Sequence, residues 1–164
     1  MYNFLKIIFF GLIILFLELL IFDIITINNI RPDFLILYIL YISLIHGRLK
    51  GLLSGFLLGI LEDFITGSIF FGLSALTKTI SGFLFGSLSG KFKKINPIFY
   101  FSYILFILGI NFFIFFYVTN QNIFNDNKSL FLNIYFYAFI YTLVFLFVLN
   151  YIKPINSLDN IEDR

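Results

Sequence analysis

The sequence predicts an all-α integral membrane protein in which six transmembrane helices form a single membrane domain over residues 1–164. Hydrophobic residues make up 60% of the chain and charged residues only 12%, and the mean hydropathy is +1.01. A water-soluble domain of this size needs far more charge to cover its surface. The absence of cysteine excludes disulfides and thiolate chemistry, and the single histidine cannot build a metal site alone. A net charge of +2 is too small to indicate nucleic-acid binding.

Apolar runs separated by short polar breaks give the predicted helices, at residues 4–25, 32–47, 49–65, 69–90, 97–118 and 130–152. The first run begins like a signal peptide, but no small-residue cleavage site follows it, so we interpret it as a retained span. The second and third runs are shorter than the roughly 20 residues that cross a bilayer. A re-entrant hairpin would place Arg48 and Lys50 near the bilayer midplane, which is costly. We therefore expect two true spans with a recessed outer end.

Glycines recur at every fourth position of the third predicted helix, at Gly51, Gly55 and Gly59, and Gly47 extends this stripe into the preceding turn. Such a stripe lets a neighbouring helix approach until the backbones touch. The fourth predicted helix repeats the spacing over residues 82–90, so the two helices are suited to pack as an antiparallel pair. The stripe is interpreted as internal packing, with docking of a partner's membrane helix as the alternative.

The positions of lysine and arginine predict the orientation. With both termini in the cytoplasm, the outer loops hold only Arg31 and Lys128, and Lys78 lies within a span. The Asn-rich stretch 119–129 is then an exposed outer loop. Basic residues concentrate on the cytoplasmic side of membrane proteins. Eight of the 11 cations fall on that side here, namely Lys6, Arg48, Lys50, Lys91, Lys93, Lys94, Lys153 and Arg164.

Two charged residues lie deep in predicted spans. Glu18 is roughly 10 Å from the outer end of the first span, and Lys78 is roughly 13 Å from that of the fourth, at 1.5 Å per residue. An unpaired charge in hydrocarbon is costly, so we expect these two residues to form an ion pair. A polar cavity for a ligand or partner helix, and a path for protons or ions, are the alternatives.

The third predicted helix ends on two acids, Glu62 and Asp63, which invites a catalytic interpretation. Adjacent helical residues point about 100° apart, so these carboxylates do not face each other across a substrate. No phosphate-binding loop is present. We therefore predict no catalytic residue, metal site or cofactor, and interpret Glu62 as the water-facing end of its helix. Pro32 and Asp33 are interpreted as the start of the second helix, Pro32 at its first position.

These residues together resemble a known family. The order is a Pro-Asp pair, a glycine with a basic turn, glycines spaced by four, a closing carboxylate, and a Phe-Gly-Leu start to the next helix. It resembles the core of the MreD family of rod shape-determining membrane proteins over about residues 30–86. The positions that carry the resemblance are Pro32, Asp33, Gly47, Gly51, Gly55, Gly59, Asp63, Phe71, Gly72 and Leu73.

The resemblance implies a non-enzymatic scaffold of the bacterial machinery for cell elongation, which builds the peptidoglycan of the lateral wall. It also implies residence in the cytoplasmic membrane and partnership with MreC, with the actin-like MreB, directly or indirectly, and with wall-synthesis enzymes. MreD proteins are similar in architecture to the substrate-binding components of energy-coupling-factor vitamin transporters. That similarity supplies the alternative function, a small-molecule binding component of a transporter.

Overall fold

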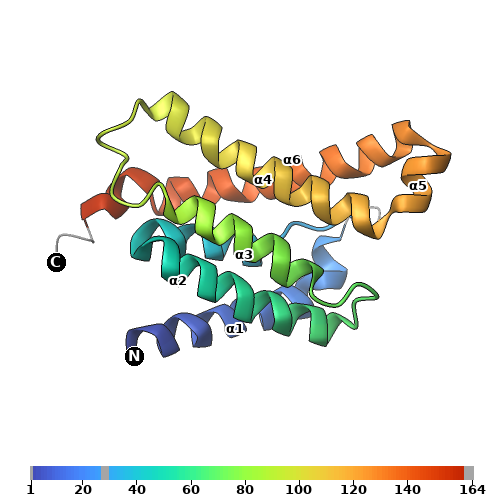
Figure 1. Cartoon of the computed structure of the whole chain (residues 1–164), viewed down its shortest axis with the longest axis horizontal. Helices are drawn as coiled ribbons and strands as arrows, with labels where there is room; N and C mark the ends of the chain where they lie inside the picture. Colours follow the sequence, from blue (N-terminus) through green and yellow to red (C-terminus); the bar gives the residue numbers. More distant parts are fainter. Residues whose placement is uncertain (1, 27–29, 161–164) are drawn as a thin grey trace.

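The structure, a computed structural model, describes residues 2–26 and 30–160, and its regular elements are helical. Arg164, counted above with the inner cations, lies outside the described residues. Figure 1 shows long helices lying side by side, with α1 along one edge of the bundle and α4 and α6 along the other. The prediction of an all-helical chain is therefore confirmed. The elements are α1 (Tyr2–Ile25), α2 (Phe34–Thr66), α3 (Leu73–Gly86), α4 (Pro97–Thr119), α5 (Gln121–Asp126), α6 (Lys128–Ile152) and a short 3-10 helix, η1 (Ile155–Asn160).

Helix α2 consists of two antiparallel segments joined at Gly47 (Figure 1). Gly47 has φ 80° and ψ −174°, a backbone conformation that essentially only glycine adopts. The chain reverses there, so that Ser43 of the first segment lies against Gly51 of the second. The first segment, residues 34–46, and the second, residues 48–66, correspond to the predicted helices 32–47 and 49–65.

The first segment of α2 is the centre of the molecule. Leu35, Ile36 and Leu37 have no exposed surface, although successive side chains point about 100° apart around the helix. One side of the segment packs on a cluster contributed by α3, α4, α6 and η1, and another packs on Leu15 of α1 and Leu58 of the second segment. A helix that is apolar all round is expected at such a position.

The glycine stripe of α2 lies against α3. A methyl group added at Gly55 would overlap the backbone carbonyl of Lys78, and one added at Gly59 would overlap the backbone of Ala75. Gly51 faces the backbone of Gly82 in the same way. The two helices therefore touch through their backbones, as small-residue stripes allow. The stripe is occupied by α3 of the same chain, which leaves no room there for a partner's helix.

Two predicted element boundaries are wrong. The fourth predicted helix, residues 69–90, is shorter in the structure, Leu73–Gly86, because the chain turns before Gly72 (φ 93°) and again through residues 87–90 to Gly90 (φ 64°). The predicted outer loop, residues 119–129, contains the six-residue helix α5. No residue of α5 is buried, so this stretch is exposed as expected.

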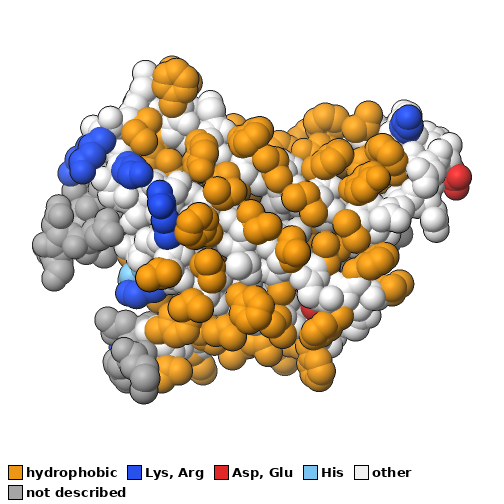
Figure 2. All heavy atoms as spheres, in the orientation of Figure 1, with side chains coloured by type: hydrophobic (Ala, Val, Ile, Leu, Met, Phe, Trp, Pro, Cys, Tyr) orange, Lys and Arg blue, Asp and Glu red, His pale blue; other side chains and the backbone are white. Residues whose placement is uncertain are grey.

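Three helices of the described chain are long and apolar enough to cross a membrane by length and composition: Phe34–Thr66, Pro97–Thr119 and Lys128–Ile152. Figure 2 shows that lysine and arginine side chains gather at one end of the visible face, where α2 reverses and α3 leads into α4. Between the two ends this face is largely apolar. This distribution suits a molecule whose central part lies in the hydrocarbon of a membrane and whose basic end lies at the membrane surface.

Candidate functional site

The charged groups of the core meet at the end of the bundle opposite the gathered cations. Glu18 comes from the C-terminal part of α1, Asp33 precedes α2, Glu62 lies in the last turns of α2, and Lys78 lies in the second turn of α3. We call Glu18, Asp33, Glu62 and Lys78 the ion cluster. Four segments that are separate in sequence therefore contribute charged side chains to one buried place.

Lys78 is the centre of the ion cluster. Its side chain is 3% exposed, and its Nζ lies 2.6 Å from Oε2 of Glu62 and 2.9 Å from Oδ2 of Asp33. A buried ammonium needs these partners, because burying an unpaired charge away from water costs on the order of several kcal/mol. The predicted direct partner, Glu18, is wrong: its Oε2 instead accepts a hydrogen bond from the backbone N–H of Leu35, at 3.2 Å.

The late start of α3 explains why Lys78 has different partners. With α3 beginning at Leu73 instead of residue 69, Lys78 lies four residues, or about 6 Å, closer to the helix end than predicted. That places its ammonium level with the start and the end of α2, where Asp33 and Glu62 are. The interpretation of Glu62 as a water-facing end is likewise wrong, since its side chain is only 13% exposed and bound to Lys78.

Asp63 points to a different target from its neighbour Glu62. Its carboxylate accepts hydrogen bonds from the backbone N–H groups of Gly72 (2.9 Å), Ser74 (3.1 Å) and Ala75 (3.4 Å), at the start of α3. These N–H groups have no partner within their own helix, and a carboxylate also suits the positive end of the helix dipole. The backbone turns at Gly72 with a φ of 93°, a conformation that glycine adopts readily and other residues do not.

The start of α2 is capped by two carboxylates. Asp33 is its N-cap and accepts a hydrogen bond from the N–H of Ile36 at 2.8 Å, while Glu18 serves the N–H of Leu35. The prediction that Asp33 begins this helix is confirmed, whereas Pro32 lies before the cap and not at the first helical position. The N–H of Asp33 also donates to Oγ1 of Thr142 at 3.2 Å, which ties α6 to the ion cluster.

Sequence reasoning missed three polar contributions next to this cluster. Thr142 is fully buried, and Asn111 of α4 donates from Nδ2 to Oγ of Ser81 in α3 at 3.0 Å. Arg31 shares a small cavity of about 10 Å³ with Glu18 and Glu62. The signal for Asn111 was available, because an amide in the middle of an apolar span requires a polar partner on another helix. Arg31 gave no such signal, because a cation in an outer loop needs no buried partner.

The chemistry of this arrangement is that of mutual neutralisation. The carboxylates accept from Lys78 or from helix N–H groups, and every buried side-chain nitrogen or oxygen in the described chain has a hydrogen-bond partner. No group of three or more His, Cys, Asp or Glu residues in the described ranges is placed to hold a metal ion. The ion cluster is thus arranged to join α1, α2, α3 and α6 to one another.

The fold and the ion cluster define a polytopic helical membrane protein whose buried charges bind its own helices together. The chain belongs to the MreD family: the family model described as rod shape-determining protein MreD matches residues 1–151. The resemblance noted from the sequence is thereby confirmed, and the chain is a rod shape-determining membrane protein of the cell-elongation machinery by family. No curated protein and no solved structure gives a significant match.

Proposed function

We propose that this chain is a non-enzymatic scaffold that holds MreC, and with it other components of lateral wall synthesis, in the cytoplasmic membrane of a bacterium. The observation that carries the proposal is the match of residues 1–151 to the MreD family. The ion cluster supports it, because Asp33 and Glu62 both bind Lys78 and are not directed into an open polar site. Chemistry on a substrate needs groups that remain free to meet it.

We further propose six membrane segments with both termini in the cytoplasm. The segments are α1, the two parts of α2 on either side of Gly47, α3, α4 and α6. The first part of α2 and α3 are each only about 20 Å long at 1.5 Å per residue, so we expect the membrane to be locally thinner beside them. The first part of α2 is mostly buried, whereas Leu76, Ile80 and Phe83 of α3 are exposed and can meet the lipid. In support, α1 begins and η1 ends at the basic end of the bundle (Figures 1 and 2).

Partner helices are proposed to dock on the outer faces of α4 and α6, since the glycine stripe is filled by α3. These faces carry exposed aromatic side chains, among them Phe106 (65% exposed) in α4 and Phe147 (67% exposed) in α6. Association of helices within a membrane depends on close van der Waals packing, for which lipid-facing side chains of this kind are available.

The alternative of a vitamin-binding transporter component has less support. The recess expected at the outer end of α2 is filled by the ion cluster, and the cavity beside Glu18, Arg31 and Glu62 has a volume of about 10 Å³. Such a volume suits one water molecule, whereas small-molecule sites measure roughly 300–1,000 Å³, so the recess at this end of α2 is too small for a vitamin. The similarity in architecture to energy-coupling-factor components stays a prediction.

Deletion of the gene and complementation test the proposal. We expect deletion to make rod-shaped cells round, and the wild-type chain to restore the rod shape without any added nutrient. Rod-shaped deletion cells that require an added vitamin for growth would contradict the scaffold proposal and favour the transporter.

A further inference from the structure

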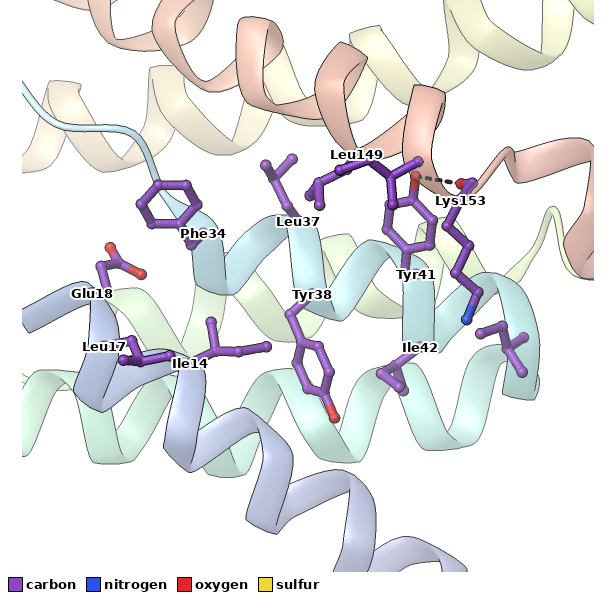
Figure 3. Close-up of a pocket in the computed structure, with 12 residues that line it drawn as sticks. Ile14, Leu17, Glu18, Phe34, Leu37, Tyr38, Tyr41, Ile42, Leu149 and Lys153 are labelled. Carbon is purple, nitrogen blue, oxygen red and sulfur yellow. Dashed lines mark hydrogen bonds between the residues drawn. The ribbon is translucent and has the colours of Figure 1, made fainter. Parts of the chain in front are cut away.

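An apolar groove of about 460 Å³ opens between α1, the first segment of α2 and α6. Figure 3 shows Leu37, Tyr38 and Tyr41 of α2 along its floor, with Ile14 and Leu17 of α1 on one side. Leu149 of α6 lies on the other side, and Glu18 and Lys153 lie at opposite ends in this view. The groove lies apart from the glycine stripe.

The groove is held open by two hydrogen bonds that fix its tyrosines. The hydroxyl of Tyr38 donates to the carbonyl of Ile7 in α1 at 2.7 Å, and that of Tyr41 donates to the carbonyl of Lys153 at the end of α6 at 3.0 Å. Each tyrosine therefore joins the floor to one wall. Because both hydroxyls are already bonded within the chain, the ring surfaces that remain are suited to an apolar occupant.

The length of the groove fits one acyl chain of a lipid, which is as long as one half of the hydrocarbon core. Its floor runs from Phe34 to Ile45 along α2, a rise of about 16 Å at 1.5 Å per residue. One half of the hydrocarbon core is about 15 Å thick. A bundle helix with side chains is about 10 Å across and would need on the order of 1,200 Å³ over this length, far more than the groove provides. The dimensions therefore favour an acyl chain over a helix.

A cation marks one end of the groove. Lys153 follows the last residue of α6, and Figure 3 shows its side chain extending from α6 toward the Ile42 end of the floor. Lys153 does not take part in the ion pairs of the ion cluster, where Asp33 and Glu62 bind Lys78. A neighbouring cavity of about 380 Å³ shares Ile14, Tyr38 and Ile42 with the groove and includes Lys6 and His46 in its lining.

We propose that the groove binds an anionic phospholipid, with an acyl chain along the floor of α2 and the phosphate at the ammonium of Lys153. Charge complementarity selects this occupant, since the apolar length ends at a lysine on the basic end of the bundle. Basic pockets between membrane helices on the cytoplasmic side favour anionic head groups. The attraction of one cation to anionic lipid is about 1 kcal/mol, which corresponds to about fivefold in affinity at 1.4 kcal/mol per tenfold. The inference requires membrane insertion but not a partner.

Quenching of a single introduced tryptophan tests this site, because the chain contains no Trp. The full chain carrying Ile152→Trp, at a groove-lining position that is 72% exposed, is reconstituted into vesicles containing brominated phosphatidylglycerol or brominated phosphatidylcholine. We expect relative affinities from quenching to favour phosphatidylglycerol by about fivefold. Position 147 lies about 140° around the same helix from position 152. For Phe147→Trp we therefore expect the two lipids to quench the tryptophan fluorescence equally.

Charge variants separate a specific site from general attraction to a basic surface. In the Ile152→Trp background, Lys153→Gln is expected to reduce the affinity ratio of phosphatidylglycerol to phosphatidylcholine to about one. Lys94 is an exposed cation at the same end of the bundle, and Lys94→Gln is expected to leave this ratio unchanged. Both substitutions are at exposed positions, and the circular dichroism of each variant verifies its fold. The proposal would be overturned if the two lipids quench the tryptophan at position 152 equally, or if neither lipid quenches it. It would also be overturned if Lys153→Gln leaves the affinity ratio unchanged.

Discussion

At the scale of single residues, Lys78 connects the two ends of α2. Asp33 stands before the first residue of that helix and Glu62 lies in its last turns, and both carboxylates reach the same ammonium. A lysine ammonium has three donors and can satisfy both acceptors at once. The hairpin at Gly47 and the ion cluster therefore close the two ends of the same antiparallel pair of segments.

The ion cluster predicts strong coupling between Lys78 and Glu62. Lys78→Met leaves two buried carboxylates without their cation, so we expect it to lower the free energy of unfolding by about 3–5 kcal/mol. Glu62→Gln alone should cost less, because Asp33 still compensates Lys78. Circular dichroism melts in detergent should show that the double variant is more stable than the sum of the single losses implies. Additive losses would contradict direct contact, and Lys94→Met, an exposed lysine, is the control.

The sequence predicts which charges of the ion cluster are buried, but their partners depend on where the helices begin and end. The sequence predicts that Lys78 and Glu18 are buried and need partners, from the cost of charge in hydrocarbon. The partner itself was mispredicted because the start of α3 is set by Asp63 and Gly72, a contact between residues nine positions apart around a turn. Hydropathy places a span within several residues but does not locate its first hydrogen bond.

At the scale of elements, the contact of α2 with α3 depends on glycine. We expect Gly55→Ala to destabilise the chain by about 1–3 kcal/mol, because its methyl group would overlap the carbonyl of Lys78 and force the helices apart. Gly109→Ala in α4 is the matched control. Its nearest neighbour would be the hydroxyl of Tyr135 at 3.4 Å, so the helical preference of alanine should leave stability unchanged or raise it. Equal thermal stabilities of the two variants would contradict this packing.

The reversal within α2 depends on the backbone of Gly47 and not on the space around it. Nothing lies within 4 Å of a Cβ added at Gly47, yet its φ of 80° with ψ of −174° is strained for any other residue. Gly47→Asn is expected to cost about 1–3 kcal/mol. Gly67, which ends α2 at φ 61° and ψ 37°, is left-handed and accepts asparagine. Gly67→Asn should therefore unfold near the wild-type temperature, and a matching loss in both variants would contradict the distinction.

The sequence predicts this pair of elements well because both signals are local. Glycines at every fourth position identify the contact face, and a glycine beside Arg48 and Lys50 identifies the reversal. Helix α5 was not predicted, because six polar and exposed residues have neither hydrophobic periodicity nor a length that distinguishes them from a loop. The polar bond of Asn111 with Ser81 required knowledge of which helices are neighbours.

At the scale of the whole molecule, the proposed orientation is open to cysteine labelling, because the chain has no cysteine of its own. Asn125 is exposed in α5, and Ser157 is exposed in η1. Figure 1 shows η1 near the end of the bundle opposite α5. With both termini cytoplasmic, an impermeant maleimide added to intact spheroplasts should label Asn125→Cys and not Ser157→Cys. Permeabilisation should expose both positions. Labelling of Ser157→Cys alone in intact spheroplasts would reverse the orientation.

Whether the chain holds partner proteins in the membrane can be measured by affinity purification from cells in mild detergent followed by mass spectrometry. We expect MreC to be recovered in amounts comparable to the chain. We expect the recovery of MreC relative to the chain to fall when the outer face of α6 is altered by Phe147→Lys, with the abundance of the chain measured in parallel. Recovery of transporter ATPases with a vitamin-sized ligand, and without MreC, would contradict a scaffold function.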